Sequence, residues 1–182
     1  MDTLCSEYAN ILEKIKPFNN LNNQHEKISQ SPIYLYVLNY IYKYNLRNIL
    51  LSLSGGVDSM VLLHILLDIK KLYKLNIYIY CCHLNYNNRE ESKLERDFLR
   101  RYCSLNNVIF NNIDINIKRG EINRGLYEKS TRDIRYKFYS ELCETYQCSG
   151  VLLAHHKDDI CENIFNNIMR GTREITDLKV IS

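Results

Sequence analysis

LSLSGGVDSMVLLHILLD, from Leu51 to Asp68, is the most informative segment of this sequence. An apolar run breaks at two adjacent glycines and resumes at once with apolar residues three and four positions apart, the spacing of an amphipathic helix. A strand, a glycine turn and a helix therefore follow one another. Adjacent glycines let the backbone bend sharply and leave its N–H groups accessible. We expect this turn to bind an electron-rich group.

The alternation of strand and helix continues on both sides of this segment. We expect strands over residues 48–54, 75–85, 108–115 and 149–156. We expect helices over residues 32–44, 57–71, 90–106, 126–146 and 158–169. Ser31 and Pro32 suit the cap and the first position of the earliest helix. Such alternation predicts an α/β fold, a doubly wound, Rossmann-like parallel sheet in a single domain. Ligands of such sheets bind beyond the carboxyl ends of the strands, so the loops after Ser54, His83, Asn116 and His155 are candidates.

Length and composition limit the function classes. With 182 residues, the chain suits one compact domain. We expect a polar N-terminal extension over 1–30, one folded domain over 31–172 and a tail over 173–182. The net charge of +3 neither identifies nor excludes a nucleic-acid binder. The seven cysteines form no CxxC pair, which favours reduced, mostly buried thiols over a zinc site or a disulfide framework. No apolar run reaches the about 18 residues of a membrane span, so we expect a soluble intracellular protein.

The glycine turn is the first candidate site. A strand end that leads into a helix N-terminus offers N–H groups and a positive dipole end, which suit a phosphate. The Walker loop and the three-glycine dinucleotide signature do not fit. Asp58 would repel phosphates without a cation between them, so we predict Mg²⁺ at Asp58. The alternative is a tight turn with Asp58 and Ser59 as capping residues. The candidate nucleotide-binding residues here are Ser54, Gly55, Gly56, Val57, Asp58 and Ser59.

SGGVDS resembles the pyrophosphate loop of the N-type ATP pyrophosphatases, the PP-loop superfamily. These enzymes release pyrophosphate while they transfer AMP to a carbonyl oxygen. The resemblance implies an adenine nucleotide alpha hydrolase-like fold, with ATP and Mg²⁺ as cofactors and Asp58 as a catalytic residue. Members share the loop but modify different acceptors, so the other segments must identify the substrate.

The segment CHLNYNNREES, from Cys82 to Ser92, follows the second expected strand. It resembles the His-x-Asn/Asp-His-x-x-Arg-x-Glu-Ser segment of the tRNA(Ile)-lysidine synthetases. The resemblance implies nucleotide binding by His83 and substrate binding by Arg89. Tyr86 stands where the family has its second histidine, and a tyrosine can still stack on a base. Without the resemblance, a lone histidine at a strand end is more often structural.

The segment LLAHHKDDICENIFNNIMRGT, from Leu152 to Thr172, resembles the family's Ala-His-His-x-Asp-Asp-x-x-Glu-Thr pattern and its later Arg-Gly. The resemblance implies that His155, Asp158 and Asp159 lie near the acceptor and the incoming amine, without selecting the general base. It also implies substrate binding by Arg170. For the second aspartate, compensation of the helix dipole is an equally good explanation.

The segment LYEKSTRDIRYKFY, from Leu126 to Tyr139, resembles the family's Glu-x-x-x-Arg-x-x-Arg-Tyr pattern. Glu128, Arg132 and Arg135 fall on one helix face. The resemblance implies that all three bind substrate and that Arg132 takes part in catalysis, since guanidinium groups match phosphate oxygens. The alternative is a solvated face with a Glu128–Arg132 ion pair worth under about 1 kcal/mol.

The four motifs occur in order between residues 48 and 172 and together imply one reaction. ATP adenylates the C2 oxygen of the wobble cytidine of a tRNA(Ile) with a CAU anticodon, and free lysine then displaces AMP. Alternatives are tRNA 2-thiolation, which normally needs a cysteine pair, and a nucleotide-binding module without catalysis. We expect no membrane partner, and a homodimer is one of the assemblies we consider. The expected location is the cytoplasm or a plastid. Because the family continues with further domains, we expect either the catalytic portion of a longer protein or a shortened form.

Overall fold

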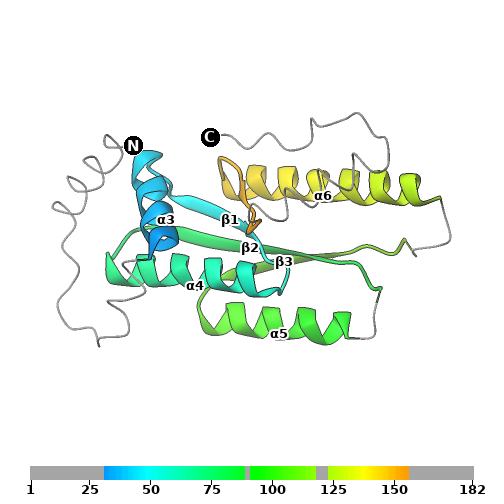
Figure 1. Cartoon of the computed structure of the whole chain (residues 1–182), viewed down its shortest axis with the longest axis horizontal. Coiled ribbons are helices and arrows are strands. Elements are labelled where there is room, and N and C mark those ends of the chain that lie inside the picture. Colours follow the sequence, from blue (N-terminus) through cyan, green and yellow to red (C-terminus); the bar gives the residue numbers. More distant parts are fainter. Residues whose placement is uncertain (1–30, 89–90, 118–122, 156–182) are drawn as a thin grey trace.

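The computed structural model describes residues 31–88, 91–117 and 123–155. Within them, four parallel strands form one sheet in the order β3-β2-β1-β4. The strands are β1 (Asn48–Ser52), β2 (Tyr78–Asn85), β3 (Ile109–Asp114) and β4 (Val151–Leu152). The helices are α3 (Pro32–Lys43), α4 (Val57–Leu72), α5 (Ser92–Leu105) and α6 (Arg124–Tyr146). The predicted α/β fold with a parallel sheet is therefore confirmed (Figure 1).

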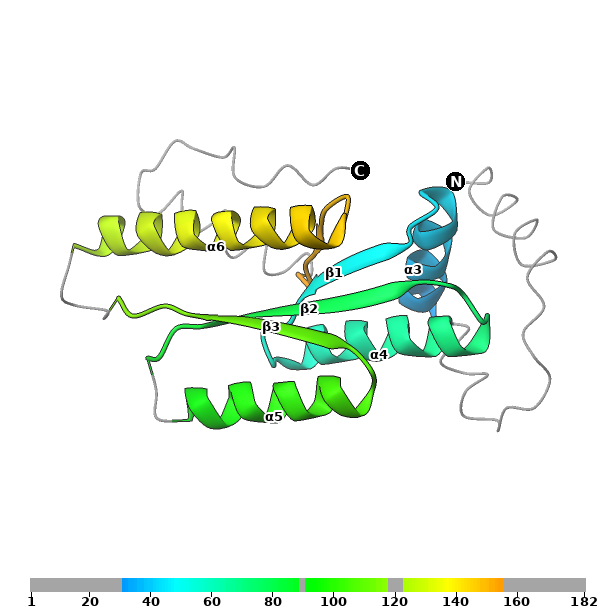
Figure 2. The ribbon, with the colours of Figure 1, turned by 180° about the vertical axis from the view of Figure 1, so that it is seen from behind.

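Helices cover both faces of the sheet (Figures 1 and 2). One face of β1, with Leu51 and Leu53, packs in a core that also contains residues of α3, α4 and α5. The opposite face, with Leu50, packs with Tyr139 and Leu142 of α6. Central strands of a parallel sheet are buried on both sides, which explains why β1 is a continuous apolar run rather than an alternating one.

The local signals at the helix ends act as expected. The Ser31 hydroxyl accepts a hydrogen bond of 3.4 Å from the Tyr34 N–H, and Pro32 occupies the first helical turn. The start of α4 at Val57 places the two glycines between β1 and α4. The expected helix over 158–169, the extension over 1–30 and the tail over 173–182 lie outside the described residues.

The described cysteines are free thiols that are buried or half-buried. Burial raises the pKa of Cys82 to about 12 and that of Cys148 to about 11. These thiols therefore remain protonated at neutral pH, as expected for core cysteines. No helix in the part of the chain that the structure describes is long and apolar enough to cross a membrane.

Candidate functional site

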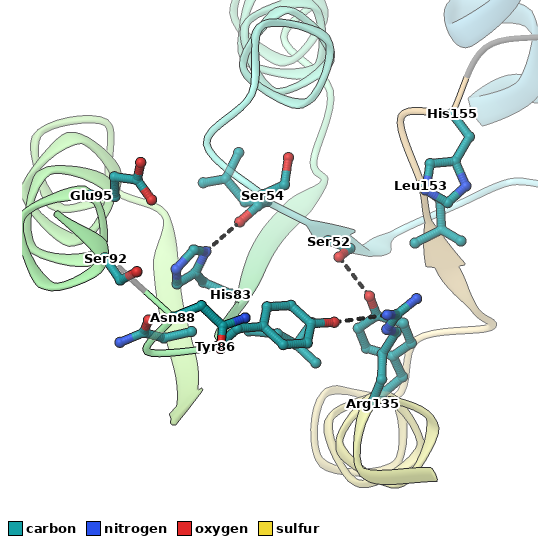
Figure 3. A pocket seen from close by; sticks show the side chains of 14 residues that line it. Ser52, Ser54, His83, Tyr86, Asn88, Ser92, Glu95, Arg135, Leu153 and His155 are labelled. Carbon is teal, nitrogen blue, oxygen red and sulfur yellow. Dashed lines mark hydrogen bonds between the residues drawn. The ribbon is translucent and has the colours of Figure 1, made fainter. Parts of the chain in front are cut away.

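A pocket of about 370 Å³ opens at the carboxyl ends of β1, β2 and β4 (Figure 3). This is the edge of a parallel sheet at which ligands are expected. Side chains from both covering layers reach it, since α5 contributes Glu95 and α6 contributes Arg135. The residues that line it are Ser52, Leu53, Ser54, His83, Leu84, Asn85, Tyr86, Asn88, Ser92, Glu95, Arg135, Tyr139, Leu153 and His155.

The glycine turn lies beside this pocket, between β1 and α4. Gly55 has a φ of +90°, a backbone conformation that side chains with a Cβ rarely adopt. Gly56 precedes the first turn of α4 without any side-chain cap. Amides in the first turn of a helix have no carbonyl acceptor within that helix, and the helix dipole makes this end positive. The turn is exposed, so its geometry suits an anion.

The two serine hydroxyls of the turn bind to the turn itself. The Ser59 hydroxyl is buried and donates to the Gly56 carbonyl at 2.9 Å. Its oxygen lies 3.1 Å from the Ser54 hydroxyl, which also accepts from the Gly56 N–H at 3.2 Å. Because the single Ser59 proton goes to the carbonyl, Ser54 is the donor between the two hydroxyls. Both hydroxyls therefore hold the turn in shape. Because the Gly56 N–H already donates to Ser54, the other backbone amides of the turn are the donors best placed for a phosphate.

His83 lies at the pocket end of β2 with its ring almost completely buried. Its Nδ1 lies 2.8 Å from the Leu53 carbonyl oxygen, and a carbonyl can only accept, so Nδ1 carries the hydrogen. The ring also stacks on Phe110, at 6.1 Å between centroids. These contacts fix the plane of the imidazole and leave Nε2 as the nitrogen available to a ligand.

On the α6 side of the pocket, two hydrogen bonds connect α6 to the end of β1 and to the residue that follows β2. The Arg135 Nη2 donates to the Tyr86 hydroxyl at 2.7 Å. One helical turn further on, the Tyr139 hydroxyl lies 2.6 Å from that of Ser52. Burial raises the pKa of Tyr139 to about 12, while the hydrogen bond with Ser52 and the nearby Arg135 charge act in the opposite direction. Tyr139 is therefore a neutral phenol at physiological pH, and Arg135 supplies the positive charge.

The structure brings several of the predicted site residues together. Ser54, His83, Arg135 and His155 all line the pocket. Glu128 and Arg132 lie further from it on the same helix and are not among its lining residues. Glu128 forms an ion pair with Arg124 at 2.9 Å, a contact that the sequence pattern did not predict. Four predicted residues lie outside the described part of the chain: Arg89, Asp158, Asp159 and Arg170.

Ser52, Tyr139 and Glu95 line the pocket but were not among the predicted residues. Tyr139 follows Arg135 by four residues, so helical spacing alone could have placed it on the same face. Ser52 interrupts an apolar strand at its last position, which is a weaker signal. Glu95 had no distinguishing signal, because acidic residues are common in the first turn of a helix.

A parallel sheet covered on both faces, with an exposed glycine turn between β1 and a helix N-terminus, defines a Rossmann-like α/β protein. A family model for the PP-loop domain matches residues 26–180. The chain therefore belongs to the PP-loop domain family, and this membership implies ATP as a ligand.

Curated relatives agree with this assignment. The tRNA(Ile)-lysidine synthase of Clostridium tetani is 35% identical over 142 residues, which cover 75% of this chain and 30% of the relative. The enzyme of the same name from Streptococcus gordonii is 34% identical over 127 residues, covering 70% of this chain and 28% of the relative. The chain thus spans less than a third of the length of these relatives.

The U34-tRNA thiolase NcsA from Methanococcus maripaludis has a similar structure, with a TM-score of 0.55. The match covers 76% of this chain and 50% of the thiolase, at 17% sequence identity. At this identity the likeness supports the fold and not the reaction.

Proposed function

We propose that this protein carries out ATP-dependent modification of tRNA(Ile), forming lysidine at the wobble cytidine. ATP would adenylate the C2 oxygen, pyrophosphate would leave, and the amine of free lysine would displace AMP. The observation that carries the proposal is the exposed glycine turn beside the pocket with Arg135 and His155, in a chain related to tRNA(Ile)-lysidine synthases.

The residues suit the nucleotide half of this reaction. The N–H groups of the turn would bind the phosphates, because they lie at a positive helix end. His83 would contact the nucleotide through Nε2, the nitrogen that its bond to the Leu53 carbonyl leaves available. The phosphate charge that develops on pyrophosphate release would be met by these donors and by Arg135 across the pocket.

Mg²⁺ fits this site as an ion that ATP phosphate oxygens would hold together with one carboxylate of the protein. Asp58 is exposed in the first turn of α4, beside the glycine turn. Within the described ranges, no group of three or more acidic, histidine or cysteine side chains could hold a metal. Mg²⁺ is commonly bound by one or two carboxylates together with phosphate oxygens and water, so a single carboxylate is compatible. When bound, the ion would neutralise charge on the leaving pyrophosphate.

The tRNA half of the proposal relies on the remaining predicted residues. Glu128, which is exposed, and Arg132, which is half-buried, would contact tRNA outside the pocket, further along α6 than the lining residues. His155 lines the pocket and would lie near the cytidine. The further assignments to Arg89, Asp158, Asp159 and Arg170 remain predictions from the sequence. We include in the proposal a cytoplasmic or plastid location, where tRNA is available, and a homodimer as a possible assembly.

Pyrophosphate exchange tests the proposal. Labelled pyrophosphate should enter ATP only when tRNA(Ile) with a CAU anticodon is present, because adenylation of the tRNA is the reversible step. With labelled lysine, the label should then appear in the tRNA. If the folded protein binds ATP but shows no exchange at any concentration, it is a nucleotide-binding module. Incorporation of sulfur instead of lysine would identify a thiolation enzyme, an activity that the lack of a CxxC pair disfavours.

A further inference from the structure

Tyr86 occupies the position at which the sequence departs from the lysidine synthetase pattern. The residue follows β2 directly and lines the pocket. Its hydroxyl accepts a 2.7 Å hydrogen bond from Arg135, which lies 49 residues later in the chain, on α6. Figure 3 shows the phenol reaching across the pocket toward the guanidinium group.

The nature of this partner determines what Arg135 can do. Arginine has a long side chain and loses considerable conformational entropy when one position is fixed. A carboxylate would fix it but would also cancel its charge in an ion pair. A phenol oxygen fixes it while remaining neutral, and it occupies only one of the five guanidinium N–H donors. Arg135 therefore keeps its positive charge and further donors for a ligand.

The hydrogen bond between Tyr139 and Ser52 holds α6 in place next to Arg135. Tyr139 lies one turn from Arg135 and is bound to Ser52 of β1 at 2.6 Å. The part of α6 that carries Arg135 is therefore held against the sheet independently of Tyr86. Loss of the Tyr86 hydroxyl should then release the arginine side chain without releasing the helix.

We propose that Tyr86 is a positioning residue, whose hydroxyl holds the Arg135 guanidinium toward a phosphate group bound in the pocket. The inference rests on the proposed function for the identity of the ligand. The phosphate would come either from ATP or from the tRNA backbone, because both offer the same oxygens to a guanidinium group.

Three variants of the full chain test this role. Tyr86→Phe removes the acceptor and keeps the ring, so it should weaken phosphate binding by about 5- to 10-fold, or roughly 1.0–1.4 kcal/mol. Tyr86→His restores the residue of the family pattern, and a neutral imidazole can accept the arginine hydrogen bond. Tyr146→Phe is the matched control, since its hydroxyl also joins α6 to the sheet, through Asn111 at 3.1 Å, but does not line the pocket.

The histidine variant provides a pH-dependent readout that a merely structural role would not give. Free histidine titrates near pH 6.5, the neighbouring Arg135 charge lowers this pKa, and a protonated imidazole cannot accept from arginine. Relative to the wild type at the same pH, Tyr86→His should therefore bind more weakly at pH 5 than at pH 8, whereas the loss in Tyr86→Phe should not change with pH. Among the described residues, the titratable and charged groups that line the pocket with Tyr86 are Arg135 and Tyr139 of α6, His83 of β2, Glu95 of α5 and His155 after β4.

The measurements are the dissociation constants of inorganic pyrophosphate and ATP, and the KM for tRNA in pyrophosphate exchange. If Tyr86→Phe raises the dissociation constant of pyrophosphate, Arg135 binds the triphosphate of ATP. If only the KM for tRNA rises, Arg135 binds the tRNA backbone. Wild-type constants in Tyr86→Phe would overturn the inference, as would equal losses in both Tyr86 variants at every pH. A wild-type protein without exchange overturns the proposed function instead, and its pyrophosphate constants still test Tyr86.

Discussion

The hydroxyl of Tyr139 lies 2.6 Å from the hydroxyl of Ser52, and this bond joins α6 to the end of β1 between two residues that line the pocket. Tyr139 is only 7% exposed, so its partner would not be replaced freely by water. We predict that Tyr139→Phe lowers the free energy of unfolding by about 1–2 kcal/mol, because the Ser52 oxygen loses its partner. Urea unfolding followed by circular dichroism measures this change.

A double-mutant cycle separates the hydrogen bond from other effects of the substitution. Ser52→Ala and the double variant with Tyr139→Phe complete the cycle. The sum of the losses in unfolding free energy of the two single variants should exceed the loss in the double variant by about 1 kcal/mol. The reason is that either substitution alone already breaks the hydrogen bond. Strict additivity of the two losses would show that the short contact contributes no stability.

The glycine turn gives a second prediction, with a matched pair of variants. Gly55 has a φ of +90°, and an added Cβ would meet Leu99 only at an ordinary contact distance of 3.5 Å. The penalty of Gly55→Ala is therefore in the backbone, and we predict a loss of about 1–2 kcal/mol in stability together with weaker ATP binding. Gly56→Ala should cost less stability than Gly55→Ala, because Gly56 has an ordinary φ of −69° and only the N-cap preference for glycine and a 3.4 Å approach of the new Cβ to the Ser54 hydroxyl oppose it. Equal effects of the two variants would contradict this explanation.

The sequence predicted the layers of the fold because its signals are local. β1 and α4 follow from an apolar run, two glycines and helical spacing, and the ends of α3 and α4 agree with the prediction to within one residue. The start of β2 is less accurate: the strand begins at Tyr78 rather than residue 75, because the Leu75 N–H binds the Lys70 carbonyl in the turn after α4. Strand order could not be read in the same way, because it depends on contacts between distant segments.

Site residues at the ends of strands could be predicted from the sequence. Site features that need a hydrogen bond between distant residues could not. Ser54, His83 and His155 follow from their positions at strand ends. The hydrogen bond between Tyr86 and Arg135 was not predictable, because it joins two motifs that the sequence treats separately. The inward direction of the Ser59 side chain, whose hydroxyl donates to the Gly56 carbonyl, was not predictable either, because the sequence allowed both a phosphate-binding and a capping role.

Asp58 provides a prediction whose sign depends on magnesium. With Mg²⁺ present, Asp58→Asn should weaken ATP binding at least about 10-fold, or 1.4 kcal/mol, because the ion loses a carboxylate ligand. With a chelator present, the same variant should bind ATP as well as the wild type or better, because a charge that repels the phosphates is gone. Calorimetric titration with and without Mg²⁺ measures both constants. Asp97→Asn, an exposed charge-matched change on α5, is the control. A loss of equal size with the chelator would argue against a metal ligand.

Tyr34 links stability to alkaline pH. Its buried hydroxyl donates to the Asp68 carboxylate at 2.9 Å, and burial, followed by this bond, raises its pKa well above the usual value. An unfolded tyrosine titrates near pH 10, so the stabilisation from Tyr34 is complete below about pH 10 and declines as the pH rises further. Tyr34→Phe should therefore lower the free energy of unfolding by about 1–3 kcal/mol at pH 8, where the charged hydrogen bond is intact.

The difference between Tyr34→Phe and the wild type should then shrink above pH 10, because phenylalanine has no proton to lose while the wild type must keep a buried phenol protonated. Urea unfolding at pH 8, 9.5 and 10.5 measures this trend. Tyr36→Phe is the control, since Tyr36 lies on the same helix with 58% of its surface exposed and should change neither the stability nor its pH dependence. A constant gap for Tyr34→Phe across this range would mean that the hydroxyl contributes through packing rather than through its proton.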